Sequence, residues 1–244
     1  MRVSTYTRFE LRRTFRNRRF FFFSLGFPLV LYYLIAAPQQ DTTDLAGTGI
    51  SAPTFFMVGL AGFGAMMGSI SSGARIAAER QVGWNRQLRI TPLSRRTYLS
   101  TKVLTAYATS LTTLVLLFAA GISLGVSLPA NEWLEMTGLM LVGLIPFAAG
   151  GIMLGHLLTT DTLGPVVGGV VSLLAFLGGT WFPITDGFLH SVAQVMPSYW
   201  LNQASHVALG GQPWGVRGWT VIAAWSAVTI LLAGWAYRRD TARV

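Results

Sequence analysis

The side chains that most often carry catalysis are few in this chain, and their spacing fits no common enzyme site. His156, His190 and His206 are its three histidines, and none has the His-Glu-x-x-His spacing of a catalytic zinc site. Asp186 and His190 are four residues apart, so they would share a helix face, and we interpret them as an interfacial polar pair. There is no cysteine, which excludes thiolate metal sites. The sequence therefore predicts neither catalytic residues nor a metal site.

The chain also lacks a phosphate-binding loop. That loop ends in Gly-Lys-Ser/Thr, whereas the single lysine, Lys102, follows Thr101. We therefore expect no cofactor in this chain, and any ATP and Mg²⁺ that drive its activity would be bound by a separate protein.

Composition places the chain in a membrane. Only 11% of its 244 residues are charged and 52% are hydrophobic, whereas soluble domains carry about 25% charged residues. The charges cluster, and the apolar intervals between clusters approach the ~20 residues of a bilayer span. The net charge of +9 would suggest nucleic acid in a soluble domain. Here it flanks apolar segments, so we expect contact with a lipid bilayer and none with nucleic acid.

We predict an all-α membrane protein in which residues 1–244 form one transmembrane domain with six transmembrane helices. The predicted spans are approximately 20–37, 54–72, 103–128, 133–158, 163–181 and 218–237. With these spans, 17 of the 18 basic residues lie in segments on one side, and Arg217 alone lies on the other. Basic loops stay in the cytoplasm, so both termini should be cytoplasmic. The near-exclusive use of arginine indicates a GC-rich bacterial genome, so we expect the protein in the plasma membrane of a bacterium.

The N-terminal segment 1–19 contains seven arginines and one acid, Glu10. The aromatic residues Tyr6, Phe9 and Phe15 are interleaved with the arginines. This pattern predicts an amphipathic helix on the membrane surface, with arginines toward the headgroups. The alternative is a disordered basic tail.

A second amphipathic segment lies between the fifth and sixth spans. Its apolar residues recur at helical spacing between two prolines. We predict an amphipathic helix or re-entrant pair at the outer interface that helps to close an exit path. The outer gate residues of this hypothesis are Pro183, Phe188, Val192, Met196 and Pro197.

The basic loop between the second and third spans contains a short predicted helix, from Gly83 to Pro92. Trp84 and Leu88 share one face at spacing i, i+4, and this apolar knob would suit a groove on a soluble partner. The alternative is a surface helix with Trp84 among lipid headgroups. Glu79, just before the helix, should pair with a basic residue.

This loop resembles that of the type-2 ABC transporter permeases, including the daunorubicin-resistance kind, which reads approximately E-R-E-x-G-T-L-E-Q-L-x-x-T-P-L-S. The matching residues are Glu79, Arg80, Gly83, Gln87, Leu88, Thr91, Pro92, Leu93 and Ser94. The departures are Gln81, Trp84, Asn85 and Arg86. Residues 179–183 and 196–200, GTWFP and MPSYW, are similar to later family elements, although a proline usual between them is missing.

The resemblance implies the permease subunit of an ABC exporter. Two six-span subunits, identical or different, would pair with two cytoplasmic ABC ATPase subunits, and the substrate, such as a drug, lipid or glycan, would pass between the membrane subunits. The helix in the first inner loop would dock on the ATPase. The residues assigned to coupling are Glu79, Arg80, Gly83, Trp84, Arg86, Leu88, Arg89 and Pro92.

Two other classes remain open from the sequence. One is an ion-driven secondary transporter or a channel subunit. Ion-driven transporters usually place ionisable groups within their spans, and the predicted spans have none at depth. The other is a membrane enzyme or scaffold, and the missing catalytic residues argue against an enzyme.

Overall fold

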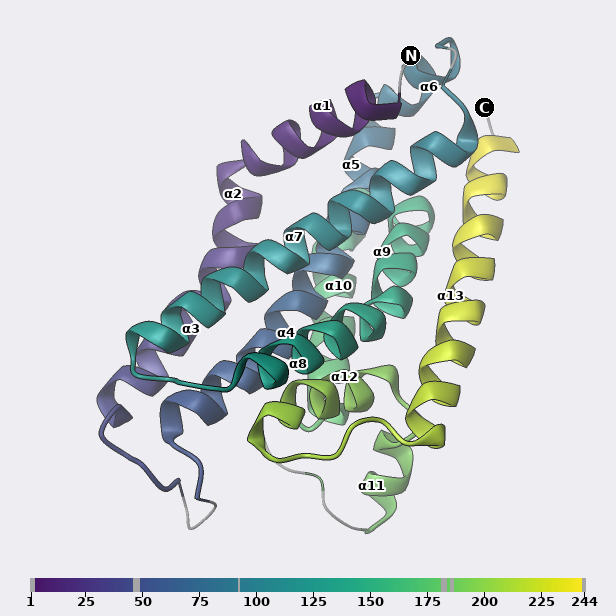
Figure 1. The fold of residues 1–244 in the computed structure, drawn as a ribbon. Helices are drawn as coiled ribbons and strands as arrows, with labels where there is room; N and C mark the ends of the chain where they lie inside the picture. The colour runs from purple at the N-terminus through teal and green to yellow at the C-terminus, as the bar shows by residue number, and fades with distance from the viewer. Residues whose placement is uncertain (1–2, 46–48, 92, 181–183, 185–186, 243–244) are drawn as a thin grey trace.

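The computed structural model describes residues 3–45, 49–91, 93–180, 184 and 187–242, and within these it is a bundle of helices without a strand (Figure 1). Its helices are α1 (Val3–Phe15), α2 (Arg18–Phe21), the π-helix η1 (Phe22–Gly26), α3 (Phe27–Ala36), the 3₁₀ turn η2 (Ala37–Gln39), α4 (Ala52–Ala74), α5 (Ile76–Gln81), α6 (Trp84–Arg89), α7 (Arg95–Ser123), α8 (Ala130–Gly143), α9 (Ile145–Leu157), α10 (Thr160–Leu177), α11 (Gly187–Ala193), α12 (Pro197–His206), the 3₁₀ turn η3 (Val207–Leu209) and α13 (Val216–Ala242).

Five helical runs among the described residues are long and apolar enough to cross a membrane. They are Ala52–Gln81, Arg95–Ser123, Ala130–Leu157, Thr160–Leu177 and Val216–Asp240. These runs coincide with the predicted second to sixth spans, so the all-α membrane class is confirmed.

The predicted first span, 20–37, is not among these five. Its apolar part is a shorter helix, Ser24–Gln39, and this part of the chain is irregular at both ends. A π-helical turn, Phe22–Gly26, precedes Pro28, and a 3₁₀ turn that contains Pro38 follows. Proline has no backbone N–H to donate, so regular α-helical bonding is interrupted near it.

α4 is the central helix of the bundle and packs between α7 and α9. On the α7 side, the hydroxyl of Ser110 donates a hydrogen bond to the carbonyl of Ala65 at 2.8 Å. On the α9 side, glycines allow the two backbones to touch. A Cβ atom on Gly151 would lie 2.5 Å from the carbonyl oxygen of Ile70, and one on Gly155 would lie 2.5 Å from that of Gly73. The close approach therefore depends on small residues, as is common where helices pack in lipid.

The segment between α10 and α13 holds two short helices, α11 and α12, where one helix or a pair was predicted. α12 packs against α8 and α4, and the indole of Trp214 donates to the carbonyl of Trp200 at 2.8 Å. The segment is therefore folded against the bundle rather than extended from it (Figure 1).

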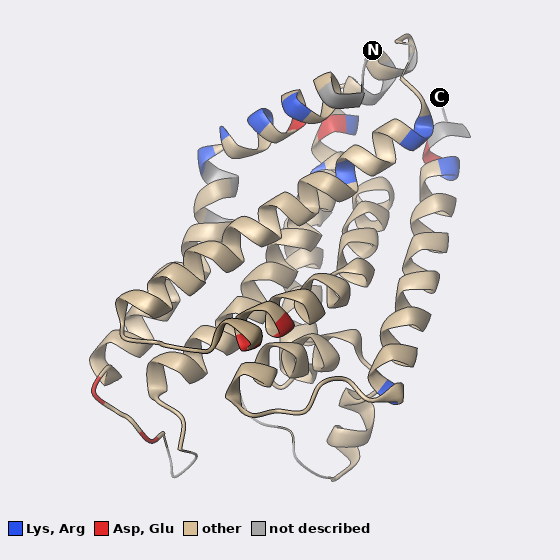
Figure 2. Ribbon diagram, viewed as in Figure 1, with Lys and Arg blue, Asp and Glu red and all other residues tan. Residues whose placement is uncertain are grey.

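Charge is segregated along the bundle (Figure 2). Most described lysine and arginine residues lie at one end, formed by α1, α5, the start of α7 and the end of α13, whereas Arg217, at the start of α13, lies at the opposite end. We call the former the basic end. The first turn of α1 and the last turn of α13 both lie there (Figure 1).

Candidate functional site

The predicted helix after Gly83 is present at the basic end as α6, six residues long. Gly83 has φ +70°, a left-handed conformation that residues with a Cβ rarely adopt, and this turns the chain from α5 into α6. We call residues 82–91 the coupling segment. As predicted, Gly83 allows the backbone turn at the start of the helix. Pro92, which was predicted to end the helix, lies outside the described residues.

The apolar face of α6 is turned toward the chain itself. Leu88 is only 9% exposed and packs in a cluster with Tyr6 of α1 and Tyr98 of α7. The ring of Trp84 stacks on that of Phe9, with 6.1 Å between centroids. We expected Trp84 and Leu88 to form an exposed knob, but here they anchor the coupling segment to the bundle. Their role in coupling stays a prediction.

Other apolar side chains of the coupling segment are exposed. Val82 is 70% exposed and Ile90 is 89% exposed, and Gln87 is also at the surface. The side chains of Arg86 and Arg89, which were assigned to coupling, lie outside the described part of the chain. Val82 and Ile90 are therefore the exposed apolar groups of this segment.

A buried ionic cluster lies beneath the coupling segment. The ammonium nitrogen of Lys102 is 2.7 Å from both carboxylate oxygens of Glu79 and 2.5 Å from Oε1 of Glu10, and all three side chains are at most 3% exposed. Nη1 of Arg13 donates to Glu79 Oε1 at 3.1 Å and lies 3.9 Å from Glu10 Oε2. The expected basic partner of Glu79 is thus present. The cluster joins α1, α5 and α7.

Lys102 and Arg13 face the two carboxylates of the cluster, and Arg75 also interacts electrostatically with both. Burial on its own would raise the pKa of Glu10, but Lys102 and Arg13 beside it lower the pKa below its ordinary value. Burial raises the pKa of Tyr6, and the neighbouring Glu10 and Glu79 raise it further. The carboxylate of Glu10 is therefore held in its charged form. Removing one member of such a buried set leaves an uncompensated charge.

A second ionic cluster joins α5, α9 and α13. Asp240 Oδ1 lies 2.7 Å from Nε of Arg80, and its Oδ2 lies 2.9 Å from Nδ1 of His156. Nη1 of Arg80 also donates to the carbonyl of Leu158 at 3.1 Å. Arg80 is one of the residues assigned to coupling. It lies on α5, just before the coupling segment, and its ion pair with Asp240 attaches α5 to α13. His156 is buried and packs its ring against Tyr237.

Sequence reasoning missed the partners in both clusters. Glu10 was assigned to a surface helix, Lys102 to the flank of a span, and Asp240 to no role. A signal existed for the first cluster: the single lysine and two of the chain's nine acidic residues lie in segments expected on the same side of the membrane. It gave no pairing.

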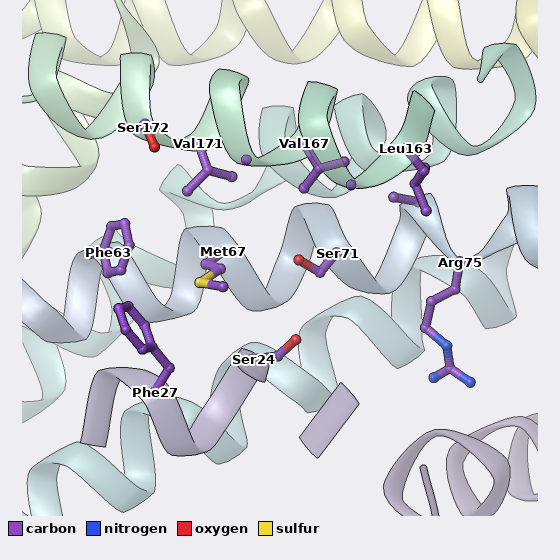
Figure 3. Close-up of a pocket in the computed structure, with 13 residues that line it drawn as sticks. Ser24, Phe27, Phe63, Met67, Ser71, Arg75, Leu163, Val167, Val171 and Ser172 are labelled. Atoms are coloured by element: carbon purple, nitrogen blue, oxygen red, sulfur yellow. The ribbon is translucent and has the colours of Figure 1, made fainter. Parts of the chain in front are cut away.

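A lateral cavity of about 650 Å³ lies between α4, α10 and the helical segment of η1 and α3 (Figure 3). Its walls are mainly apolar, with Phe27, Phe63, Met67 and Val171 facing the space (Figure 3). Arg75 and Leu163 line the end nearer the basic end. The cavity offers an apolar surface along the bundle with a guanidinium at one end.

The predicted outer gate residues lie at the opposite end of the bundle. Phe188 is 85% exposed, Val192 and Met196 are half-buried, and Pro197 is buried, while Pro183 lies outside the described residues. The indole of Trp225 on α13 donates to the carbonyl of Val195 at 2.8 Å. This hydrogen bond attaches the chain just after α11 to α13.

The long apolar helices define a multi-pass membrane protein, and the described residues contain no group of side chains able to hold a metal ion. The family model described as "ABC-2 family transporter protein" matches residues 37–236. The chain belongs to this family, which confirms the predicted relationship to the type-2 ABC transporter permeases.

A relative from Bacillus subtilis (strain 168) has the name "Putative transport permease YvfS". It is 27% identical to this chain over 234 residues, which cover 92% of this chain and 88% of the relative. The similarity therefore extends through nearly all of both proteins.

Proposed function

We propose that this chain is the permease subunit of an ABC exporter, driven by a separate ATPase that docks on the coupling segment. The observation that carries the proposal is the pair of exposed apolar side chains, Val82 and Ile90, on the coupling segment. This segment directly follows α5, which two ionic clusters attach to the bundle. Family membership supports the transport role, and the absence of a phosphate-binding loop supports a separate source of ATP hydrolysis.

The proposed docking surface differs in its residues from the sequence hypothesis. Val82 and Ile90 would contact the ATPase directly, since apolar anchors in the centre of an interface supply most of its binding energy. Trp84 and Leu88 would not contact the ATPase; they would hold the coupling segment against the bundle. Arg86, Arg89 and Pro92 remain assigned to coupling on the family pattern.

The two clusters suggest how motion at the ATPase would reach the membrane. A force on α6 acts on α5, where Glu79 is bound to α7 and α1 through Lys102 and Glu10, and Arg80 is bound to α13 through Asp240. Buried ionic contacts of this kind resist separation because each lost partner leaves a desolvated charge. We infer that helices at the basic end would move together.

We propose six crossings, with the basic end and both termini in the cytoplasm. The additional crossing is the helical run 18–39, from α2 to η2. A helix of that length extends about 30 Å, the thickness of the hydrocarbon core. The concentration of basic residues at one end supports the orientation.

The lateral cavity beside α10 is proposed as part of the substrate path, completed by a second permease subunit. Large apolar side chains of α10, such as Leu173 and Phe176, are 59% and 41% exposed. Such a face needs either lipid or a second subunit against it. The outer helices α11 and α12 would close the far end of the path.

Purification from native membranes tests the proposed function. Affinity-tagged chain should retain an ABC ATPase with a phosphate-binding loop, and the complex should hydrolyse ATP and export substrate in vesicles. The purified chain alone should hydrolyse none. ATP turnover by the chain alone, with contaminants excluded, or purification without any ATPase under conditions that preserve other ABC complexes, contradicts the proposal.

Cysteine labelling tests the orientation, because the native chain has no cysteine. An impermeant thiol reagent applied to intact cells should label Thr42→Cys and His190→Cys but not Arg86→Cys or Thr241→Cys. The reverse pattern would place the basic end outside the cell.

A further inference from the structure

The outward face of α1 contains a basic pocket that the proposed function does not use. The cavity, of about 510 Å³, is lined by Phe9, Arg12, Arg13, Arg16 and Asn17. Arg12 and Arg16 are one helical turn apart and exposed. Within the described part of the chain, neither guanidinium has an ion-pair partner. Two guanidinium groups on one face can hold a phosphate group by paired hydrogen bonds.

The charge of this face is uniformly positive. The acid of α1, Glu10, is turned inward and bound to Lys102, so it does not neutralise the pocket. Arg8 and Arg18 are exposed nearby and extend the positive surface. The partner that this surface fits is therefore an anion.

Exposed aromatic side chains, one in the pocket and three in the chain that follows α1's first turns, indicate that the anion belongs to a lipid. Phe9, Phe15, Phe21 and Phe22 are between 37% and 57% exposed, and the chain continues from α1 and α2 directly into the apolar helix α3. A helix with arginines and exposed aromatic rings is suited to the boundary between headgroups and acyl chains. A soluble phosphate would leave these rings in water.

Two of the residues that line the pocket, Phe9 and Arg13, contact Trp84 of the coupling segment. Phe9 stacks on Trp84, and the guanidinium carbon of Arg13 lies 5.7 Å from the centre of the Trp84 ring. Arg13 also bonds to Glu79 in the buried cluster. A phosphate held by Arg12 and Arg16 would therefore fix α1 where it touches Trp84.

We propose that this pocket binds the phosphate headgroup of an anionic phospholipid, and that the bound lipid steadies the coupling segment through Phe9 and Arg13. The binding step stands on the pocket alone. Its effect on coupling rests on the proposed function. Anionic lipid should raise the fraction of ATP hydrolysis that is coupled to transport.

Lipid binding is tested by titrating the purified full chain in detergent with phosphatidylglycerol or phosphatidylcholine and counting bound lipids by native mass spectrometry. The wild type should bind phosphatidylglycerol preferentially. Arg12→Gln with Arg16→Gln should lower that affinity about thirtyfold, from the contribution of two arginines at a membrane surface. The control, Arg96→Gln with Arg239→Gln, removes the same charge from exposed sites outside the pocket and should bind like the wild type.

Three results of this titration overturn the site: equal binding of both lipids by the wild type, an unchanged affinity in the pocket variant, or an equal loss in the control. Arg12→Lys with Arg16→Lys preserves the charge but not the paired geometry, and it should bind more weakly than the wild type. Binding equal to the wild type would indicate diffuse attraction instead of a headgroup site. Displacement of the lipid by equimolar glycerol phosphate would assign the pocket to a soluble anion.

The coupling step is tested with the complete transporter in nanodiscs made of phosphatidylcholine with or without phosphatidylglycerol. Transport per ATP should rise with phosphatidylglycerol in the wild type and the control, but not in Arg12→Gln with Arg16→Gln. Specific lipid binding without any lipid effect on transport overturns the regulatory step alone. A complex that neither hydrolyses ATP nor transports in any lipid counts against the proposed function, while the binding titration still decides the site.

Discussion

Lys102 on α7 and Glu79 on α5 meet in the interior of the basic end, with the ammonium nitrogen 2.7 Å from both carboxylate oxygens. Glu79 lies near the end of the run Ala52–Gln81, which begins in the central helix α4, and it precedes the coupling segment by only a few residues. This contact therefore joins the centre of the bundle to the surface on which we propose that the ATPase docks.

Loss of Lys102 should destabilise the protein strongly. Lys102→Gln leaves Glu10 and Glu79 buried without the ammonium group that contacts both carboxylates, and breaking a buried pair in this way costs about 3–5 kcal/mol. The melting temperature in detergent, followed by fluorescence-detected size exclusion, should fall clearly. Glu79→Gln with Lys102→Gln should recover part of the loss, and the exposed Arg96→Gln should change little. A single variant as stable as the wild type would mean that the cluster is not structural.

Acid should weaken the attachment of α1. The pKa of Glu10 in the folded protein lies below its ordinary value of 4.5 because Lys102 and Arg13 outweigh the effect of burial. Its stabilising contribution is therefore complete above about pH 4.5 and is lost as the pH falls through the lower, folded pKa. Melting temperatures of the wild type and Glu10→Gln should converge over that range. A constant difference from pH 7 to pH 3 would contradict this assignment.

The contact between α4 and α9 predicts that alanine substitutions at two adjacent glycines, Gly150 and Gly151, will change stability differently. A Cβ on Gly151 meets the backbone of Ile70 at 2.5 Å, whereas one on Gly150 has no atom within 4 Å. Gly151→Ala should therefore lower stability by about 1–3 kcal/mol through overpacking. Gly150→Ala should be neutral or slightly stabilising, because alanine favours helix. Equal melting temperatures for the two variants would show that α4 and α9 do not touch here.

The outer helices should affect transport without affecting ATPase binding. Val192 and Met196 are half-buried at the end opposite the coupling segment, so Val192→Asp with Met196→Asp should disturb closure of the proposed exit path. We expect export to fall severalfold while the ATPase still co-purifies. Ser191→Asp, on the exposed side of α11, is the control. Normal export by the double variant would remove the outer segment from the pathway.

Hydropathy predicted most of the fold because each span must bury about 20 apolar residues in lipid. The predicted spans 103–128 and 218–237 correspond to Arg95–Ser123 and Val216–Asp240, with differences mainly at the ends. For the predicted first span, 20–37, composition indicated an apolar helix but not its π-helical turn at Phe22–Gly26. Apolar content alone does not distinguish an α-helical turn from a π-helical one.

The site was less predictable because its key contacts join residues far apart in the sequence. Glu10 and Lys102 are 92 residues apart, and His156 and Asp240 are 84 apart, so no local pattern contains either pair. The apolar face of α6 was visible in Trp84 and Leu88, but a six-residue helix does not indicate which surface covers that face. In the structure, Tyr6 and Tyr98 contact Leu88, which leaves Val82 and Ile90 as the exposed apolar groups.

The most direct test of ATPase docking on the coupling segment is Val82→Asp with Ile90→Asp, assayed by ATPase pull-down and vesicle transport on matched amounts of protein. Val216→Asp, also a highly exposed apolar residue but at the opposite end, is the control. If the two side chains together contribute about 2 kcal/mol or more, ATPase affinity should fall at least thirtyfold and transport should be lost, while the control retains both. A double variant that folds, retains the ATPase and exports at the wild-type rate would contradict the account.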